Sequence, residues 1–203
     1  MKKFFLILIA FSAITINSAK AQAVWGARVG LSIPTVSSSF TVKGSGQETY
    51  KNSVDGKFGL ELGPVLYYSF NSNFYINPSL MFSIKTFDFG DNESLSMYYA
   101  DIPVYAGYNF SLGSVSLYAQ AGPFVGFKLG ENAPKIDGEK TEDSGFKSIN
   151  AGLGAIVGVS LKRFKIELGY QQGLMNLEKE AETEFYSVKT TMSSLFIGIN
   201  YVF

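Results

Sequence analysis

Hydrophobic and polar residues alternate with a period of two along most of the chain. The last eleven residues, Ser193–Phe203, show the pattern most clearly, because every second residue from Phe203 back to Leu195 is apolar or aromatic. The intervening positions are small, polar or mixed. Since successive side chains of a strand point to opposite faces, this stretch is predicted to be a β-strand with one apolar face.

Seven further segments alternate in the same way, and turn residues separate them. No helical period of 3.6 residues is sustained anywhere. The first of the seven is expected to end at Pro34. The predicted strands are Ala23–Ile33, Lys57–Phe70, Phe74–Phe87, Met97–Phe110, Val115–Leu129, Ser148–Leu161 and Phe164–Met175, followed by the closing strand.

The connections between these strands fall into two classes. Those after the second, fourth and sixth strands are two to four residues long, whereas the others are long and polar. Short turns at one end and long loops at the other are typical of transmembrane barrels, with the short turns periplasmic. Strands of about 9–11 tilted residues cross a bilayer. The fold predicted is therefore all-β, an eight-stranded antiparallel up-and-down transmembrane β-barrel.

A soluble eight-stranded barrel of the lipocalin type is the main alternative fold. It would place its apolar face inside and its charges outside. Here the more polar face carries few charges and many glycines, which suits a crowded interior better than a solvated exterior. The apolar face carries almost no charge and has aromatic residues near both ends, as expected for contact with lipid.

The N-terminus predicts export. Lys2 and Lys3 precede an apolar run from Phe4 to Ile16, and Ala19-Lys20-Ala21 follows as a small-x-small cleavage site. We therefore expect a signal peptide over residues 1–21 and a mature barrel domain over 22–203, located in the outer membrane of a Gram-negative bacterium. An uncleaved anchor is disfavoured because the apolar run is short.

Charge and cysteine content narrow the possible partners. Lys and Arg number 17, and so do Asp and Glu; three of the lysines lie in the predicted signal peptide, which leaves 14 against 17. A mildly acidic mature chain argues against a nucleic-acid partner, which would require a basic patch. Because there is no cysteine, neither a disulfide framework nor a lipoprotein anchor is expected.

Two internal segments resemble the PorT-like outer-membrane β-barrel family of Bacteroidetes. They are Tyr99–Gly107 (Y-A-D-I-P-V-Y-A-G) and Ala119–Gly126 (A-Q-A-G-P-F-V-G). The family pairs an L-x-I-P strand with an A-G-P-x-x-G strand, opens with G-x-x-x-G, here Gly26–Gly30, and ends with G-x-x-Y-x-F. Ala100 stands where the family often has leucine. The resemblance covers the whole mature chain.

The resemblance also implies how the chain is assembled. A final strand that ends on an aromatic residue is the insertion signal of such barrels, which assigns Tyr201 and Phe203 to recognition by the barrel-assembly machinery. The founding member is associated with a protein-secretion system of Bacteroidetes. That role does not carry over by resemblance alone, since one fold supports many functions.

The composition excludes several kinds of chemistry. Without histidine or cysteine there is no Ser-His-Asp triad, no cysteine nucleophile and no histidine-ligated metal. We expect no enzyme activity, no cofactor and no metal site. Twelve of the 17 acids lie in the last three long loops, without EF-hand spacing, and are interpreted as a solvated rim facing lipopolysaccharide.

Inward-facing charges form the candidate site. Strand parity and distance from the short turns predict a cluster of Glu61, Lys85 and Asp101. Arg28 and Glu167 are expected to form a second, more periplasmic group. These charges would neutralise one another and, with neighbouring side chains, fill a lumen that is narrow in any eight-stranded barrel.

Two functions remain open. The first is a small structural or surface-interaction barrel that acts through its extracellular loops. The second is an accessory of protein secretion or of small-solute transport. Expected partners are outer-membrane lipid and lipopolysaccharide, the barrel-assembly machinery, and an unidentified surface or secretion partner.

Overall fold

The computed structural model describes residues 22–42, 48–90, 93–132, 135–136, 139–140, 145–178 and 186–203. The predicted signal peptide, residues 1–21, lies outside these ranges. In the described ranges, no helix is long and apolar enough to cross a membrane.

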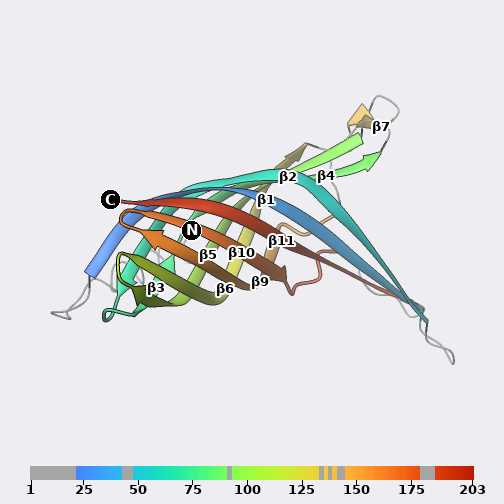
Figure 1. Cartoon of the computed structure of the whole chain (residues 1–203). Helices are drawn as coiled ribbons and strands as arrows, with labels where there is room; N and C mark the ends of the chain where they lie inside the picture. Colours follow the sequence, from blue (N-terminus) through green and yellow to red (C-terminus); the bar gives the residue numbers. More distant parts are fainter. Residues whose placement is uncertain are drawn as a thin grey trace, which may run out of the picture.

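The chain forms one closed antiparallel sheet (Figure 1). Its strand order is β1-β11-β10-β9-β6-β5-β3-β2-β4, and β1 also pairs with β2, which closes the ring. β3 and β4 together occupy one strand position between β2 and β5. The ring therefore has eight strand positions, and the predicted eight-stranded barrel is confirmed. The strands are β1 Gln22–Val42, β2 Glu48–Ser69, β3 Phe74–Pro78, β4 Met81–Gly90, β5 Glu93–Leu112, β6 Val115–Asn132, β9 Ile149–Leu161, β10 Phe164–Gly173 and β11 Tyr186–Val202, with a separate hairpin of β7 Lys135–Ile136 and β8 Glu139–Lys140.

The predicted end of the first strand is wrong. β1 continues through Pro34 to Val42 and stays paired with β11 from Gly26 to Val42. Its register with β2 shifts between Ser32 and Thr35, so Pro34 sits at an irregularity of the β1–β2 ladder. A bulge is one of the few places in a sheet where a residue without an N–H is tolerated.

The third predicted strand is broken in its middle. β3 ends at Pro78 and β4 begins at Met81, while Ser79 and Leu80 keep backbone hydrogen bonds to the two neighbouring strands. The Ser79 amide donates to the Pro103 carbonyl and the Leu80 amide to the Pro64 carbonyl. The alternation of side chains survives the break, because Met81 and Lys85 remain buried and Phe82 remains exposed.

Burial confirms the predicted direction of the two faces. The apolar set points outward, and many of its large side chains are about half exposed, as expected for a surface that meets lipid. The polar set points inward and is buried. On β11, for example, Ile197 is 54% exposed whereas its neighbour Phe196 is 2% exposed.

The outer face of β1, β2 and β11 changes sharply from apolar to polar along the strands. At Leu31 the cross-strand partners are Ile197 and Leu60, and from Thr35 onward every outward partner is polar. The polar rows are Thr35 with Ser193 and Asp55, Ser37 with Thr191 and Ser53, Ser39 with Lys189 and Lys51, and Thr41 with Ser187 and Thr49. The edge of the apolar band therefore lies between Ile33 and Thr35, and the three strands continue beyond it.

The barrel divides into two arms at this end (Figure 1). β1, β2 and β11 run together in one arm, while β4 and the β7–β8 hairpin lie in the other. The pairing of β2 with β4 reaches only as far as Gly56 and Phe87. Beyond that point β2 pairs with β1 alone and β4 with β5 alone, so the wall of the barrel opens there.

The short connections lie at the other end and are hydrogen-bonded turns. Asn71 caps one of them, since its side-chain oxygen accepts from the amides of Asn73 and Phe74 at 2.9 and 2.7 Å. Gly113 has φ of 70°, a left-handed conformation that suits glycine in a tight hairpin turn. These turns are the ends we expect to be periplasmic.

Single cysteines test this orientation, because the chain has none of its own. Ser37→Cys, on the outer face of the arm, should react with an impermeant maleimide on intact cells. Ser72→Cys, in a short turn, should react only after the outer membrane is permeabilised. The reverse pattern would invert the barrel. Tags near Gly46, Asn92, Gly138 and Glu182, which lie outside the described residues, should likewise be reached from outside.

The C-terminal residue takes part in closing the barrel. Phe203 donates its backbone N–H to the Trp25 carbonyl at 2.9 Å, and its ring packs against Tyr201 with centroids 5.6 Å apart. Deletion of Phe203 removes the hydrogen bond across the β1–β11 seam and the ring contact at the end of β11. It should lower the fraction of folded, heat-modifiable protein on unheated gels. Phe70→Ala, another exposed aromatic near the short turns, is the control and should assemble normally.

Candidate functional site

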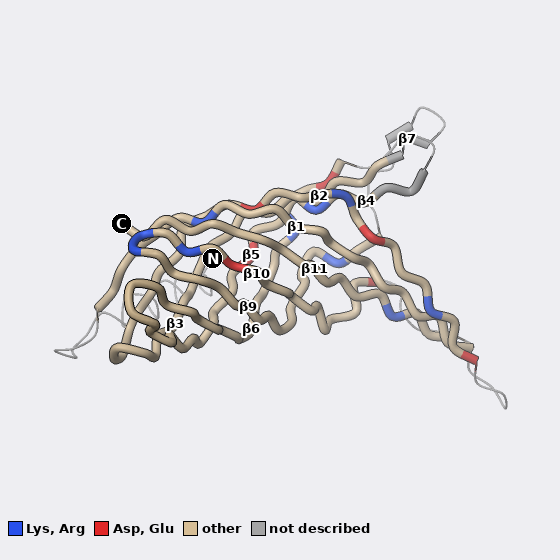
Figure 2. The backbone as a smooth tube through the Cα atoms, in the orientation of Figure 1, with Lys and Arg blue, Asp and Glu red and all other residues tan. Residues whose placement is uncertain are grey.

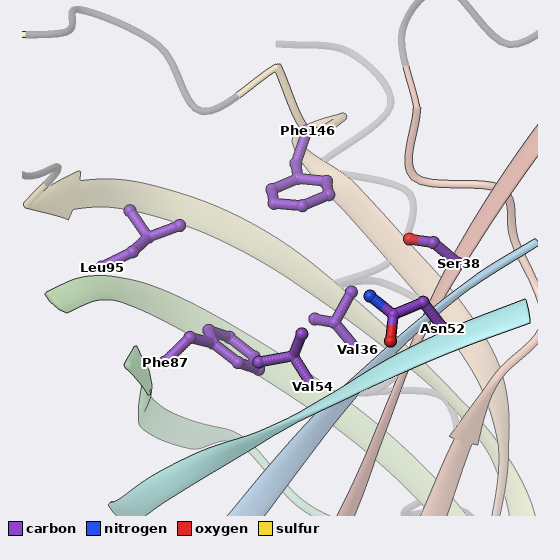
Figure 3. A pocket seen from close by; sticks show the side chains of 7 residues that line it. All are labelled: Val36, Ser38, Asn52, Val54, Phe87, Leu95 and Phe146. Carbon is purple, nitrogen blue, oxygen red and sulfur yellow. The ribbon is translucent and has the colours of Figure 1, made fainter. Parts of the chain in front are cut away.

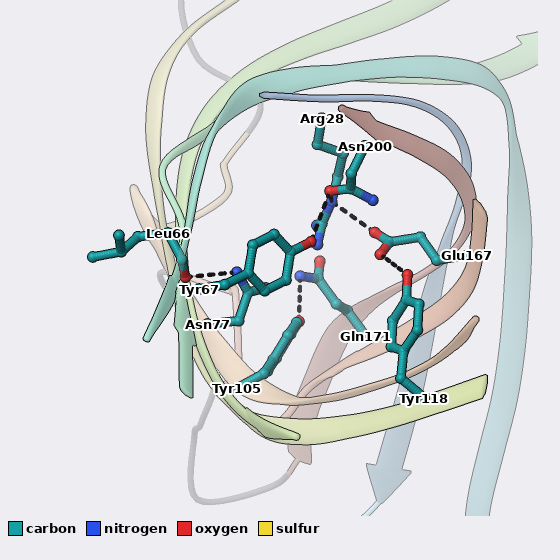
Figure 4. Close-up of polar contacts among 9 residues, drawn as sticks. All are labelled: Arg28, Leu66, Tyr67, Asn77, Tyr105, Tyr118, Glu167, Gln171 and Asn200. Carbon is teal, nitrogen blue, oxygen red and sulfur yellow. Dashed lines mark hydrogen bonds and ion pairs between the residues drawn. The ribbon is translucent and has the colours of Figure 1, made fainter. Parts of the chain in front are cut away.

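A charged network crosses the lumen in the part of the barrel nearer the short turns (Figure 4). The Arg28 Nε atom lies 2.7 Å from Glu167 Oε1, and both side chains are almost fully buried. Tyr118 donates its hydroxyl to Glu167 Oε2 at 2.8 Å. Arg28 Nε and the Tyr67 hydroxyl both donate to Asn200 Oδ1 at 3.3 Å. The network thus links five strands, β1, β2, β6, β10 and β11.

Strand register explains how this pair can form. Arg28 lies opposite Asn200 on β11, and Glu167 lies opposite Gly198 on the same strand. The two residues therefore lie on a diagonal across β11, which the long Arg28 side chain spans to reach the carboxylate on β10. Some glycines of the inner face do make room for neighbouring side chains. A methyl group on Gly126 would collide with Asp101.

A second ion pair lies nearer the outer end. Lys85 Nζ is 3.3 Å from Asp101 Oδ2, and the same oxygen accepts a hydrogen bond from Ser83 at 2.6 Å. The Lys85 ammonium also lies 4.6 Å from the centre of the Tyr99 ring. Both charged side chains are only 4% exposed, so this pair, like the first, is shielded from solvent.

The structure places all five predicted lumen residues inside the barrel. Arg28 is with Glu167, and Lys85 is with Asp101. Glu61 is buried as well, and it faces Gly30 on β1 and Ser83 on β4, but within the described residues it forms no ion pair. It therefore lies between the two pairs. Figure 2 shows that few positions along the barrel wall are charged.

A lysine enclosed by tyrosines was missed by the reasoning from sequence. Lys165 Nζ lies 3.8, 4.7 and 5.1 Å from the ring centres of Tyr67, Tyr118 and Tyr75. All four residues have inward parity and lie within a few positions of a short turn, so the signal was present in the sequence. Cation–π contacts of this kind hold an ammonium without a carboxylate.

The outer end of the lumen is apolar. Phe87, Leu95, Met97, Tyr99, Leu177 and Met192 form one buried cluster, against which Val36 and Phe146 pack. We call these six buried residues the apolar plug. Its members come from β4, β5, β11 and the segment after β10. Buried side chains thus occupy the lumen from Tyr75 near the short turns to the plug at the other end.

This arrangement is suited to holding the barrel rigid. Gln171 donates to the Tyr105 hydroxyl at 2.9 Å and Asn77 to the Leu66 carbonyl at 2.9 Å, which adds neutral bonds between strands. Among the described residues, no group of three acidic side chains is placed to hold a metal ion. The geometry provides ion pairs and hydrogen bonds that link the strands of the barrel.

Most of the predicted acidic rim falls outside the described side chains. Two of its acids are seen. Glu131 lies 2.9 Å from Lys128 Nζ, and Glu178 accepts a hydrogen bond from Thr190 at 2.8 Å. The rim acids whose side chains are not described are Asp88, Asp91, Glu93, Asp137, Glu139, Glu142, Asp143, Glu180, Glu182 and Glu184.

Solved outer-membrane proteins are similar to the chain at low identity. Neisserial surface protein A covers 85% of this chain and 97% of its own, with 15% identity and a TM-score of 0.46. OprG from Pseudomonas aeruginosa covers 91% and 97%, with 12% identity and a TM-score of 0.47. Ail, the attachment invasion locus protein of Yersinia pestis, covers 86% and 98%, with 20% identity and a TM-score of 0.37. None of the curated proteins matches the chain.

The family is settled by a match to a family model. The model describes an outer membrane protein beta-barrel domain, and it matches residues 17–179, which include every strand except β11. Together with the closed eight-stranded barrel, this match confirms the predicted location in the outer membrane of Gram-negative bacteria. The chain belongs to the outer membrane protein beta-barrel domain family.

Proposed function

We propose that this protein is a small structural and surface-interaction barrel that works through the outer ends of its strands. The observation that carries the proposal is the polar arm. β1, β2 and β11 leave the apolar band together and present four rows of hydroxyl and charged side chains on one face. A three-stranded sheet held outside the bilayer offers a flat, hydrogen-bonding surface to a partner.

The lumen supports a role without passage of solute. Two buried ion pairs, the enclosed Lys165 and the apolar plug occupy successive levels of the barrel. An eight-stranded barrel has an interior just wide enough for such side chains. The lumen residues therefore act in stability, and the protein is proposed to be neither an enzyme nor an open pore.

The more specific assignments follow from the sequence motifs. The chain is proposed to be a PorT-like protein of Bacteroidetes, exported by a signal peptide over residues 1–21 and folded as one domain over 22–203. Its proposed partners are outer-membrane lipid, lipopolysaccharide at the acidic rim, and the barrel-assembly machinery acting on Tyr201 and Phe203. The motifs also keep an accessory role in secretion or small-solute transport as the second candidate.

Site-specific photocrosslinking on intact cells separates the two candidates. A crosslinking amino acid at Ser37 or Thr41 reports on the outer face of the arm. The same group at Ser72 reports on a short turn, and at Leu31 on lipid. Surface interaction predicts a discrete adduct from Ser37 and Thr41 only. Adducts from Ser72, together with loss of exported proteins on deletion of the gene, would favour the secretion role.

Planar-bilayer recording tests the blocked lumen separately. The purified barrel is expected to give no steady conductance steps, because paired charges and the apolar plug leave no aqueous path. Steady steps of porin size would contradict a purely structural barrel and favour transport.

A further inference from the structure

We propose that a pocket between the two arms binds a small apolar molecule that carries one hydrogen-bonding group. The pocket has a volume of about 140 Å³ (Figure 3). It lies at the outer end of the barrel, apart from the polar face of the arm. Its lining residues are Val36, Ser38, Asn52, Val54, Phe87, Leu95 and Phe146.

Two cross-strand pairs build one wall of the pocket. Val36 pairs with Val54, and Ser38 pairs with Asn52 one step farther from the barrel. Both pairs point to the inner face of the arm, opposite to the polar rows. The wall is thus apolar near the barrel and polar near its outer edge.

The other arm and the plug complete the enclosure. Phe87 and Leu95 are themselves a cross-strand pair of β4 and β5, and Phe146 lies above them in Figure 3. Phe87 and Leu95 belong to the apolar plug, against which Val36 and Phe146 pack. The floor of the pocket is therefore apolar, and the plug separates it from the buried charges below.

The divergence of β2 from β4 creates the space. Pairing between the strands stops at Gly56 and Phe87, just below Val54. A methyl group on Gly56 would collide with Pro34 and with the Thr86 carbonyl, so the backbones approach here as only glycine allows. Above this contact β2 follows β1 away from β4, and side chains line the gap between β2 and β4.

The dimensions and chemistry define the ligand. An engineered apolar cavity of about 150 Å³ stays dry and binds benzene, so a pocket of this size fits a single ring or a chain of about six to eight carbons. At the polar edge, Ser38 already shares a hydrogen bond with Thr190 at 2.9 Å. Within the described residues, the Asn52 amide makes no hydrogen bond. It is therefore placed to bind a hydroxyl or carbonyl group of the ligand.

Benzyl alcohol and toluene are suitable probes, because they share a ring and differ in one hydroxyl. The refolded barrel in lipid nanodiscs would be titrated with each while backbone amide shifts of Val36, Val54 and Leu95 are followed by NMR. Val54→Phe fills the pocket, whereas Ser53→Phe places the same ring on the outer face of the same strand. Asn52→Ala removes the hydrogen-bonding group alone.

Wild type and Ser53→Phe should show saturable shifts with both probes and a preference for benzyl alcohol. Val54→Phe should lose them, while gel heat-modifiability shows that it has folded. Asn52→Ala should bind benzyl alcohol about fivefold more weakly, as expected for one hydrogen bond, and toluene as before. Shifts that are linear in probe concentration and equal in Val54→Phe would show partition into lipid and overturn the proposal. Failure here would leave the crosslinking test of the arm unaffected.

Discussion

Replacing Arg28 by methionine should lower the free energy of unfolding of the barrel by roughly 3–5 kcal/mol, the usual cost of leaving one partner of a buried ion pair uncompensated. The substitution keeps the volume of the side chain stem and removes the charge. It leaves Glu167 without its ion-pair partner at 2.7 Å, in a site where it is almost fully buried. It also removes one of two hydrogen bonds to Asn200.

Urea unfolding in lipid bilayers would measure this loss through Trp25. It is the only tryptophan of the chain and lies exposed on the lipid-facing side. Lys51→Met, a lysine on the exposed outer face of the arm, is the matched control and should change stability by less than about 0.5 kcal/mol. The double variant Arg28→Met with Glu167→Leu should recover most of the loss, because an apolar pair has no buried charge to solvate. Equal midpoints for Arg28→Met and Lys51→Met would contradict an energetic role for the pair.

The period-two pattern was sufficient to predict the barrel and the direction of nearly every side chain. This is because a strand that meets lipid on one face and packed side chains on the other must alternate strictly. Arg28, Glu61 and Lys85 were placed inside by parity alone. The pattern could not show where pairing stops. The pattern predicts that the first strand ends at Pro34, whereas a register shift accommodates this residue within β1.

Individual contacts in the lumen depend on stagger between strands, which sequence parity does not contain. Parity predicts that Lys85 meets both Glu61 and Asp101, whereas within the described residues the structure pairs it with Asp101 alone. The enclosed Lys165 and the pocket at Val54 each need side chains from three or more strands at the same level of the barrel. Which side chains share a level is set by the register of all the strands in the ring.

Replacing Lys85 by methionine should also destabilise the barrel, by about 3 kcal/mol, at the lower end of the range for a broken buried pair. Asp101 would keep the Ser83 hydrogen bond at 2.6 Å, which offsets part of its lost partner. The loss also includes the contact of the ammonium with the Tyr99 ring. Labelling of Ser37→Cys on intact cells should be unchanged, since the arm lies outside this level of the lumen.

The relation between the two ion pairs gives the sharper form of this prediction. Glu61 faces the neighbours of both pairs and forms no ion pair within the described residues. The losses from Arg28→Met and Lys85→Met should therefore add to within about 0.5 kcal/mol in the double variant. Adding Asp101→Asn to Lys85→Met should restore stability, because the amide is neutral and can still accept from Ser83. A double variant that departs from additivity by more than about 1 kcal/mol would show that Glu61 couples the pairs into one network.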